Sequence, residues 1–261
     1  MLSFNEMKSK LHEKLVAYNS VIKTCQRCGL AYTRRHALCG QGNIEGRIML
    51  IAQAPGKIED QKGEMFIGTS GKYLDELLKR AAITRDDIYM TNLIKCKLPG
   101  NREPRDSEID ACTVHLMQEI VLIDPEIIIP LGYWASRYIL GNFNAQSVTK
   151  NSLSDIWGKF YLVESKVVYP LPHPSALIYK TSRMPEFAEK YRKLNVLLKP
   201  CKWYPVCPIK HFTDQGKLDP QWVQLYCRGD WESCVRYHME ENSEYHPDWM
   251  LPDGTLDEQL R

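Results

Sequence analysis

Apolar residues gather in four short runs that turn residues separate from one another. The runs span 47–52, 88–92, 126–131 and 167–171; most are rich in Ile and Val, and none alternates between apolar and polar residues. Continuous apolar strands are typical of a sheet that is covered on both faces. We therefore predict four buried strands.

Between these runs, apolar residues recur at helical spacing. The pattern predicts helices over 71–82, 107–123, 134–140 and 185–198. Strands and helices that alternate in this way form βαβ units with parallel strands. The predicted fold is an α/β three-layer sandwich with a central four-stranded parallel sheet.

The composition changes near Lys199–Pro200, where the last predicted helix ends. The segment 200–261 holds four of the six tryptophans and four of the nine cysteines. Such a segment is too aromatic for a disordered tail. We predict a domain over 1–199 and a small Cys- and Trp-rich extension over 200–261, either as an appended module or as a wrap on the main domain.

Overall composition excludes several classes of protein. A chain of 261 residues with 44% apolar residues buries a full core, and a net charge of +2 does not suggest a strongly basic nucleic-acid binder. No apolar run approaches the roughly 18 residues of a membrane span, and the first residues lack the apolar core of a signal peptide. We expect a cytoplasmic protein without membrane contact. Nine cysteines in a reducing compartment then suggest metal ligands or buried thiols rather than disulfides.

One set of cysteines has a spacing that suits an inorganic centre. Cys25 and Cys28 form a C-x-x-C pair, and Cys96 and Cys112 follow from distant segments. Together they can close a four-thiolate site. The pair alone is a weak signal, since buried cysteines also serve as small apolar residues. A thioredoxin-type dithiol is disfavoured, because this motif precedes the first strand.

Chemically capable residues follow the ends of the predicted strands. Glu59 and Asp60 come just after a Pro–Gly turn, where they would orient or deprotonate a water, and Phe66 lies between two glycine-rich turns as a platform for a flat base. Asn92 ends the second strand, and His173 stands between two prolines after the fourth. Each residue also has an ordinary structural interpretation: a solvated acid, a core aromatic, a helix cap or a structural histidine.

Taken together, these motifs resemble the family-four uracil-DNA glycosylases, which carry a [4Fe–4S] cluster. The similarity runs from Cys25 to Leu198, in the order and near the spacing of the family. Its markers are C-x-x-C, Ala54-Pro-Gly with Glu59-Asp60, the Phe66 turn, Thr91-Asn-Leu-Ile-Lys-Cys96, Asn101-Arg102, Cys112 and His173-Pro174.

The resemblance implies that the cluster is bound by Cys25, Cys28, Cys96 and Cys112. It also implies that Glu59 positions the attacking water, with Asp60 as the fallback. The other implied roles are stacking for Phe66, leaving-group support for His173, help in holding the site for Asn101, and approach of the backbone N–H groups of Gln53 and Ala54 to the base carbonyl. Leu177, four residues after His173, would fill the gap that the extruded base leaves.

Asn92 would read the base, because its amide offers a donor beside an acceptor. Uracil presents the complementary pair of groups, whereas cytosine presents the opposite pattern at its amino position. The implied activity is hydrolysis of the N-glycosidic bond of uracil in DNA, which leaves an abasic site for base-excision repair. The partner is DNA with a damaged base, and we expect a monomer.

Two departures from the family pattern keep other functions open. Gln53 stands where the family usually has glutamate, which leaves room for another base preference, such as hypoxanthine, or for a non-catalytic iron–sulfur DNA-binding sensor. The stretch 97–101 is short and has no histidine, which argues against the covalent trapping of some relatives.

The extension contains a second set of cysteines outside the resemblance: Cys201, Cys207, Cys227 and Cys234. Their spacing allows a second cluster or a Zn²⁺ site, but also buried or free thiols. Cys39 has no partner in either set, and we expect it to be a free thiol.

Overall fold

A computed structural model describes residues 4–142, 149 and 152–261. At its centre lies a six-stranded sheet with the strand order β1-β3-β2-β4-β6-β5. The strands are β1 (Gln41–Gly42), β2 (Ile48–Ala52), β3 (Ile88–Asn92), β4 (Ile127–Pro130), β5 (Tyr161–Val163) and β6 (Lys166–Val168). The four inner strands are parallel, whereas β1 and β5 pair antiparallel at the two edges.

The prediction of a four-stranded sheet is therefore correct for the parallel centre but wrong in its strand count. The two edge strands have only two and three residues and lie outside the apolar runs, so the sequence pattern does not reveal them. The fourth predicted strand is also shorter than expected. It ends at Val168, although backbone hydrogen bonds to β4 continue at Tyr169 and Leu171, where an isolated bridge joins Leu131 and Leu171.

The four predicted helices correspond to α3, α4, α5 and α8, with ends that differ by no more than two residues. The helices are α1 (Phe4–Lys23), α2 (Lys57–Lys62), α3 (Thr69–Arg80), α4 (Asp106–Ile123), α5 (Gly132–Asn142), α6 (Leu153–Ile156), α7 (Ala176–Tyr179), α8 (Met184–Leu197), α9 (Pro208–Asp214) and α10 (Val235–Glu241). Within the described residues, no helix is long and apolar enough to cross a membrane.

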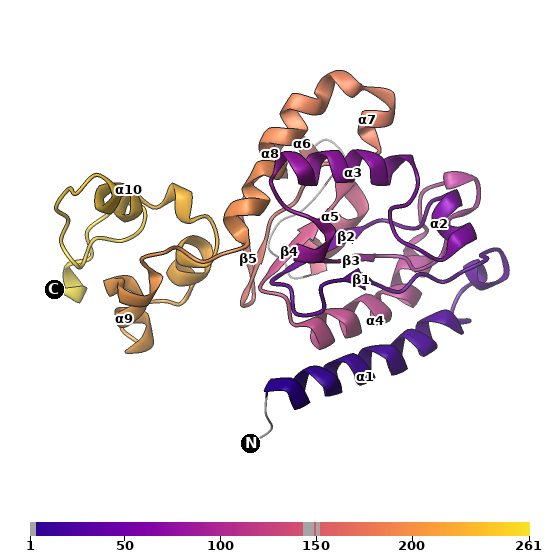
Figure 1. Cartoon of the computed structure of the whole chain (residues 1–261), viewed down its shortest axis with the longest axis horizontal. Helices are drawn as coiled ribbons and strands as arrows, with labels where there is room; N and C mark the ends of the chain where they lie inside the picture. Colours follow the sequence, from indigo (N-terminus) through magenta and orange to yellow (C-terminus); the bar gives the residue numbers. More distant parts are fainter. Residues whose placement is uncertain (1–3, 143–148, 150–151) are drawn as a thin grey trace.

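Helices cover both faces of the sheet (Figure 1). Neighbouring strand residues point to opposite faces, so Met49 and Ile51 pack with α1, α4 and α5, whereas Ile48 and Leu50 pack with α3 and α8. This burial on both faces explains why the inner strands consist mainly of apolar residues. Because these strands are parallel, their carboxyl ends share one edge, where ligands bind in open α/β sheets.

The extension lies beside this sandwich and adds no strand to the sheet (Figure 1). It holds a small apolar core of its own and contacts the main domain through polar groups. The indole N–H of Trp231 donates to the carbonyl of Val196 at 3.0 Å, and Lys193 pairs with Asp230 at 2.7 Å. The division at 199/200 stays a prediction.

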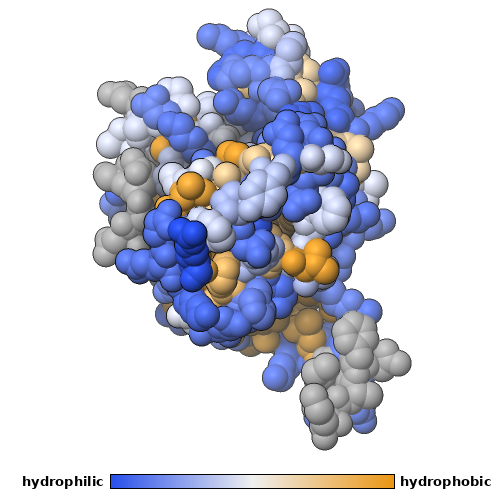
Figure 2. Space-filling view, turned by 90° about the vertical axis from the view of Figure 1, so that its left-hand side faces the viewer, coloured by the Kyte–Doolittle hydropathy of each residue, from blue (hydrophilic) through white to orange (hydrophobic). Residues whose placement is uncertain are grey.

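Figure 2 shows the left-hand side of the view in Figure 1. The surface on this side is mainly hydrophilic, with scattered apolar spots.

Candidate active site

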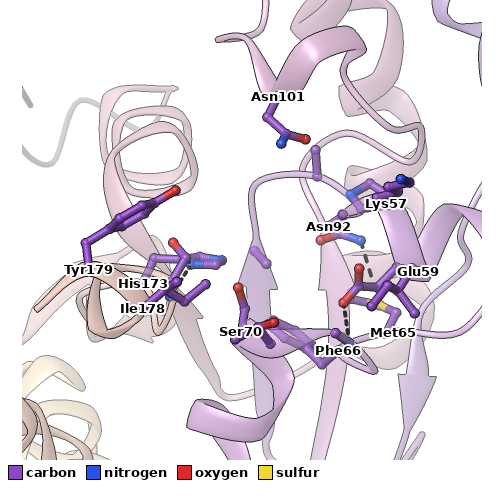
Figure 3. Close-up of a pocket in the computed structure, with 18 residues that line it drawn as sticks. Lys57, Glu59, Met65, Phe66, Ser70, Asn92, Asn101, His173, Ile178 and Tyr179 are labelled. Carbon is purple, nitrogen blue, oxygen red and sulfur yellow. Dashed lines mark hydrogen bonds between the residues drawn. The ribbon is translucent and has the colours of Figure 1, made fainter. Parts of the chain in front are cut away.

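A pocket of about 440 Å³ opens at the carboxyl ends of β2 and β3 (Figure 3). Its lining includes six of the predicted site residues, namely Ala54, Glu59, Phe66, Asn92, Asn101 and His173. Gln53 lines an adjoining hollow that shares Ala54, Asn101 and His173 with the pocket. The fold thus brings together residues that lie far apart in the sequence, in a volume suited to a small ligand.

Glu59 lies in the first turn of α2, and its carboxylate is held at the pocket wall. Its Oε1 accepts a hydrogen bond from the N–H of Gly68 at 2.8 Å, and only 8% of the residue is exposed. A Cβ atom on Gly56 would lie 2.4 Å from Oε2, and one on Gly68 would lie 2.9 Å from Oε1. The glycines therefore make room for a fixed, buried carboxylate.

Asp60, the fallback acid, has a different task. Its Oδ1 accepts hydrogen bonds from the N–H groups of Arg35 at 2.9 Å and of His36 at 3.3 Å. It does not line the pocket. Asp60 thus anchors the segment that leads into β1, and Glu59 is the acid that faces the pocket.

Phe66 adopts a left-handed backbone conformation, with φ at 53°. Such a conformation costs roughly 1 kcal/mol in a residue other than glycine. Arg85 holds it in place by donating to the carbonyls of Phe66 at 2.7 Å and Met65 at 3.2 Å, while Asp75 binds the guanidinium. A Cβ atom on Gly71 would lie 1.6 Å from the Phe66 carbonyl oxygen. These contacts fix the backbone of the turn and thereby the position of the Phe66 ring.

Asn92 is the last residue of β3 and is 3% exposed. Its Nδ2 lies 3.9 Å from the sulfur of Met65, which is a weak acceptor. The Asn92 carbonyl accepts from Lys95 Nζ at 2.9 Å, and Lys95 forms a buried ion pair with Glu119. Glu119 also accepts from Thr91 Oγ1 at 2.7 Å. This network fixes the backbone at Asn92, and sequence reasoning did not find it.

His173 is half-buried and faces Phe66, with ring centroids 6.4 Å apart and an interplanar angle of 28°. The N–H of Ser175 donates to Nδ1 at 3.1 Å. Because Nδ1 accepts, the proton of the neutral ring is on Nε2. Desolvation lowers the pKa of His173 to about 4. The ring is therefore a neutral hydrogen-bond donor at physiological pH.

This pKa gives a direct prediction for the titration of His173. The neutral form is favoured in the folded protein, so the ring should not titrate near pH 6.5, the usual value for histidine, and should take up its proton only as the pH falls toward about 4. Histidine-selective NMR, with a His173→Gln variant to assign the signal, measures this. A His173 signal that titrates above about pH 6 would contradict the assigned environment.

The wedge role of Leu177 stays a prediction, because the structure contains no DNA, but this side chain is not exposed. Leu177 is fully buried in the core below α7, whereas the next two residues, Ile178 and Tyr179, are 40% and 87% exposed. Both line the pocket and lie at one side of its opening (Figure 3). Sequence spacing alone could not tell which face of this short helix packs on the sandwich.

The first cysteine set surrounds one region between α1, the end of β3 and α4. The Arg34 guanidinium donates to Cys96 Sγ and the Lys95 N–H to Cys112 Sγ, each at 3.2 Å. Burial raises the pKa of the Cys96 thiol, and the nearby thiols of Cys25 and Cys28 raise it further.

Among the described residues, no group of three or more His, Cys, Asp or Glu side chains is arranged to hold a metal ion. A single Zn²⁺ needs all its sulfurs about 2.3 Å from one point. In a [4Fe–4S] cluster each thiolate binds a different iron, so the sulfurs stand farther apart. Four cysteines gathered in one region are the donor set that a [4Fe–4S] cluster needs.

Comparisons with known proteins agree with this geometry. Residues 39–198 match the family model described as the uracil DNA glycosylase superfamily. The chain is 35% identical to a type-4 uracil-DNA glycosylase of Archaeoglobus fulgidus over 67% of its own length and 89% of the relative's. It is 36% identical to the type-4 enzyme of Saccharolobus solfataricus over 68% and 83% of the two chains. A type-5 enzyme of Pyrobaculum aerophilum is 27% identical over 66% and 80%.

Proposed function

Since the chain belongs to the uracil DNA glycosylase superfamily, we propose that it hydrolyses the N-glycosidic bond of uracil in DNA and leaves an abasic site for base-excision repair. The observation that carries the proposal is the convergence of Glu59, Phe66, Asn92 and His173 on one pocket. Stacking, edge recognition, water placement and leaving-group support are thereby available together.

Recognition begins when the damaged base leaves the DNA stack, at a cost of a few kcal/mol. The base stacks on Phe66, and the Asn92 amide bonds a carbonyl and the adjacent N–H of uracil. Cytosine places an amino group where uracil has this carbonyl. Its binding would leave buried polar groups unpaired, which costs on the order of 1–3 kcal/mol for each group.

Hydrolysis forms a bond from water to the sugar C1′ and breaks the bond from C1′ to the base. Glu59 orients the water and favours its deprotonation. The bonding electrons leave with the base, and the negative charge spreads onto its carbonyl oxygens. The Nε2–H of His173 and the N–H groups of Gln53 and Ala54 stabilise this charge.

Cys25, Cys28, Cys96 and Cys112 would bind the [4Fe–4S] cluster in this proposal. Bound to these residues, a cluster would hold α1, the segment after β3 and α4 together, and the hydrolysis itself transfers no electrons. Cys96 follows Lys95, whose side chain bonds the Asn92 carbonyl. Cys96 would thereby link a bound cluster to the strand end that carries Asn92.

The test of this function is release of uracil from labelled oligonucleotides by anaerobically purified protein. We expect release from single strands and from U·G pairs, with less from U·A pairs, because a weaker pair lowers the cost of extrusion. Absence of release from all three would contradict the proposal. Release of hypoxanthine alone would support the altered base preference that Gln53 suggests, and binding without any release would support a sensor.

Substitutions of the two neighbouring acids should have different effects, one on catalysis and the other on stability. Glu59→Gln is expected to lower kcat by about a hundredfold or more, because the amide cannot take up a proton from water. Asp60→Asn should keep most of kcat and lower the free energy of unfolding by about 1–3 kcal/mol, because it weakens two hydrogen bonds to a buried carboxylate. Single-turnover kinetics and urea unfolding measure the two effects, and equal losses of kcat would contradict the assignment.

The exposed residues of α7 are the better wedge candidates. Tyr179→Ala is expected to weaken the binding of double-stranded substrate by about tenfold, since an aromatic contact with a base contributes roughly 1–3 kcal/mol. Tyr245, at 84% exposure in the extension, gives a matched control. If Tyr179→Ala and Tyr245→Ala bind duplex DNA equally well, α7 does not enter the DNA.

A further inference from the structure

The four cysteines of the extension line one cavity of about 60 Å³. They come from four separate places in the chain: Cys201 after α8, Cys207 at the start of α9, Cys227 at the end of a π-helical turn, and Cys234 at the start of α10. Three are buried and Cys207 is half-buried. The fold therefore gathers four thiols that the sequence spaces over more than thirty positions.

Backbone amides surround these sulfurs. N–H groups two or three residues further along the chain face three of the four thiols: those of Trp203 and Tyr204 at Cys201, that of Ile209 at Cys207, and those of Arg236 and Tyr237 at Cys234. N–H groups at these positions can donate hydrogen bonds to cysteine sulfurs that bind a cluster.

A buried cation completes the site. Arg236 is 3% exposed, and its Nη1 donates to the carbonyls of Pro247, Asp248 and Met250 at 2.8–3.0 Å. Its Nε has no hydrogen bond, and no carboxylate in the described part of the chain pairs with it. A buried cation needs an anionic partner. Arg236 lines the cavity, and its guanidinium is close enough to the thiol of Cys207 to interact with it by hydrogen bonding and charge. In the first set, Arg34 donates to Cys96 in the same way.

The extension also has few apolar contacts of its own, so a further cross-link would stabilise it. Its two α-helices have seven residues each, and its core cluster contains six buried residues with five partly buried residues packed against them. Natural segments of this size often add disulfides or a metal to so small a core. All four cysteines are free thiols, so disulfides do not supply the support.

We propose that Cys201, Cys207, Cys227 and Cys234 bind a second iron–sulfur cluster of the [4Fe–4S] type, which holds the extension together. The four cysteines line a shared cavity of about 60 Å³. Space between the thiols suits a cluster, in which each thiolate binds a different iron, better than one Zn²⁺, which four sulfurs would enclose at about 2.3 Å. Arg236 offsets part of the negative charge of the ligated thiolates. The proposal does not depend on glycosylase activity.

The test is a count of iron and acid-labile sulfide in anaerobically purified full-length protein. Two clusters give about eight irons per chain. The double variant Cys207→Ser/Cys234→Ser should keep about half of this iron, and so should Cys25→Ser/Cys28→Ser. Cys39→Ser, which removes a buried cysteine outside both sets, is the matched control and should keep all of it.

About four irons per chain in the wild-type protein would overturn the proposal, whether or not zinc is also present, and zinc would show that the site takes a single ion instead. The wild-type count stays decisive even if the extension of a serine variant fails to fold. Because the readout is metal content, its failure is distinct from a failure to release uracil.

Discussion

Asn92→Ala should lower kcat/KM for uracil release by about a thousandfold or more. The substitution removes the donor and the acceptor that pair with the base edge, and it leaves the polar groups of uracil unpaired in a buried pocket. The side chain is 3% exposed, so water does not replace the lost bonds easily. Single-turnover release from a U·G oligonucleotide measures the effect.

Asn242→Ala provides the matched control, since this asparagine is exposed in the extension, after α10. It should release uracil at the wild-type rate. Circular dichroism and the iron count should be unchanged in both variants. An Asn92→Ala protein that keeps its fold and loses less than about tenfold in kcat/KM would show that another group reads the base.

His173→Ala is expected to lower kcat by about a hundred- to a thousandfold and to change substrate affinity little. The Nε2–H contact strengthens as charge develops on the departing base, so its loss acts on the transition state more than on the bound substrate. His12→Ala, at an exposed position of α1, is the control. Single-turnover rates at saturating enzyme give kcat, and DNA binding measured separately gives affinity.

A His173→Ala protein with weaker DNA binding and an unchanged chemical rate would contradict this role. A His173→Gln variant refines the test, because glutamine also presents an N–H donor. It should recover part of the rate if the donor is what matters. Equal rates for the alanine and glutamine variants would indicate that the ring shape, rather than the hydrogen bond, contributes.

Much of the sandwich is predictable because its strands and helices leave strong local patterns. Strands β2 and β4 are continuous apolar runs, β3 is apolar over its first three residues, and α3, α4, α5 and α8 have helical periodicity. The edge strands β1 and β5 cannot be predicted from the sequence, because pairing over two or three residues depends on a neighbouring strand rather than on local sequence.

The site, too, has parts that local sequence predicts and parts that depend on tertiary contacts. The placement of Glu59, Asn92 and His173 at one pocket is predictable, since each lies at or after the carboxyl end of a parallel strand. The groups that hold them are not, because Arg85 reaches Phe66 and Glu119 reaches Lys95 only through the folded chain.

Two further features depend on tertiary contacts. The face of α7 that buries Leu177 is set by packing against the sandwich. In the extension, cysteine spacing suggested a site, but the shared cavity and the buried Arg236 appear only in the structure.

The central claim is that the turns after β2, β3 and β6 form one pocket that binds a uracil. A crystal structure of the protein with abasic DNA and free uracil tests it most directly. We expect the uracil ring on Phe66, its carbonyl and N–H at the Asn92 amide, and Nε2 of His173 at its other carbonyl. Uracil bound away from Asn92 and His173, with the pocket empty, would contradict the claim.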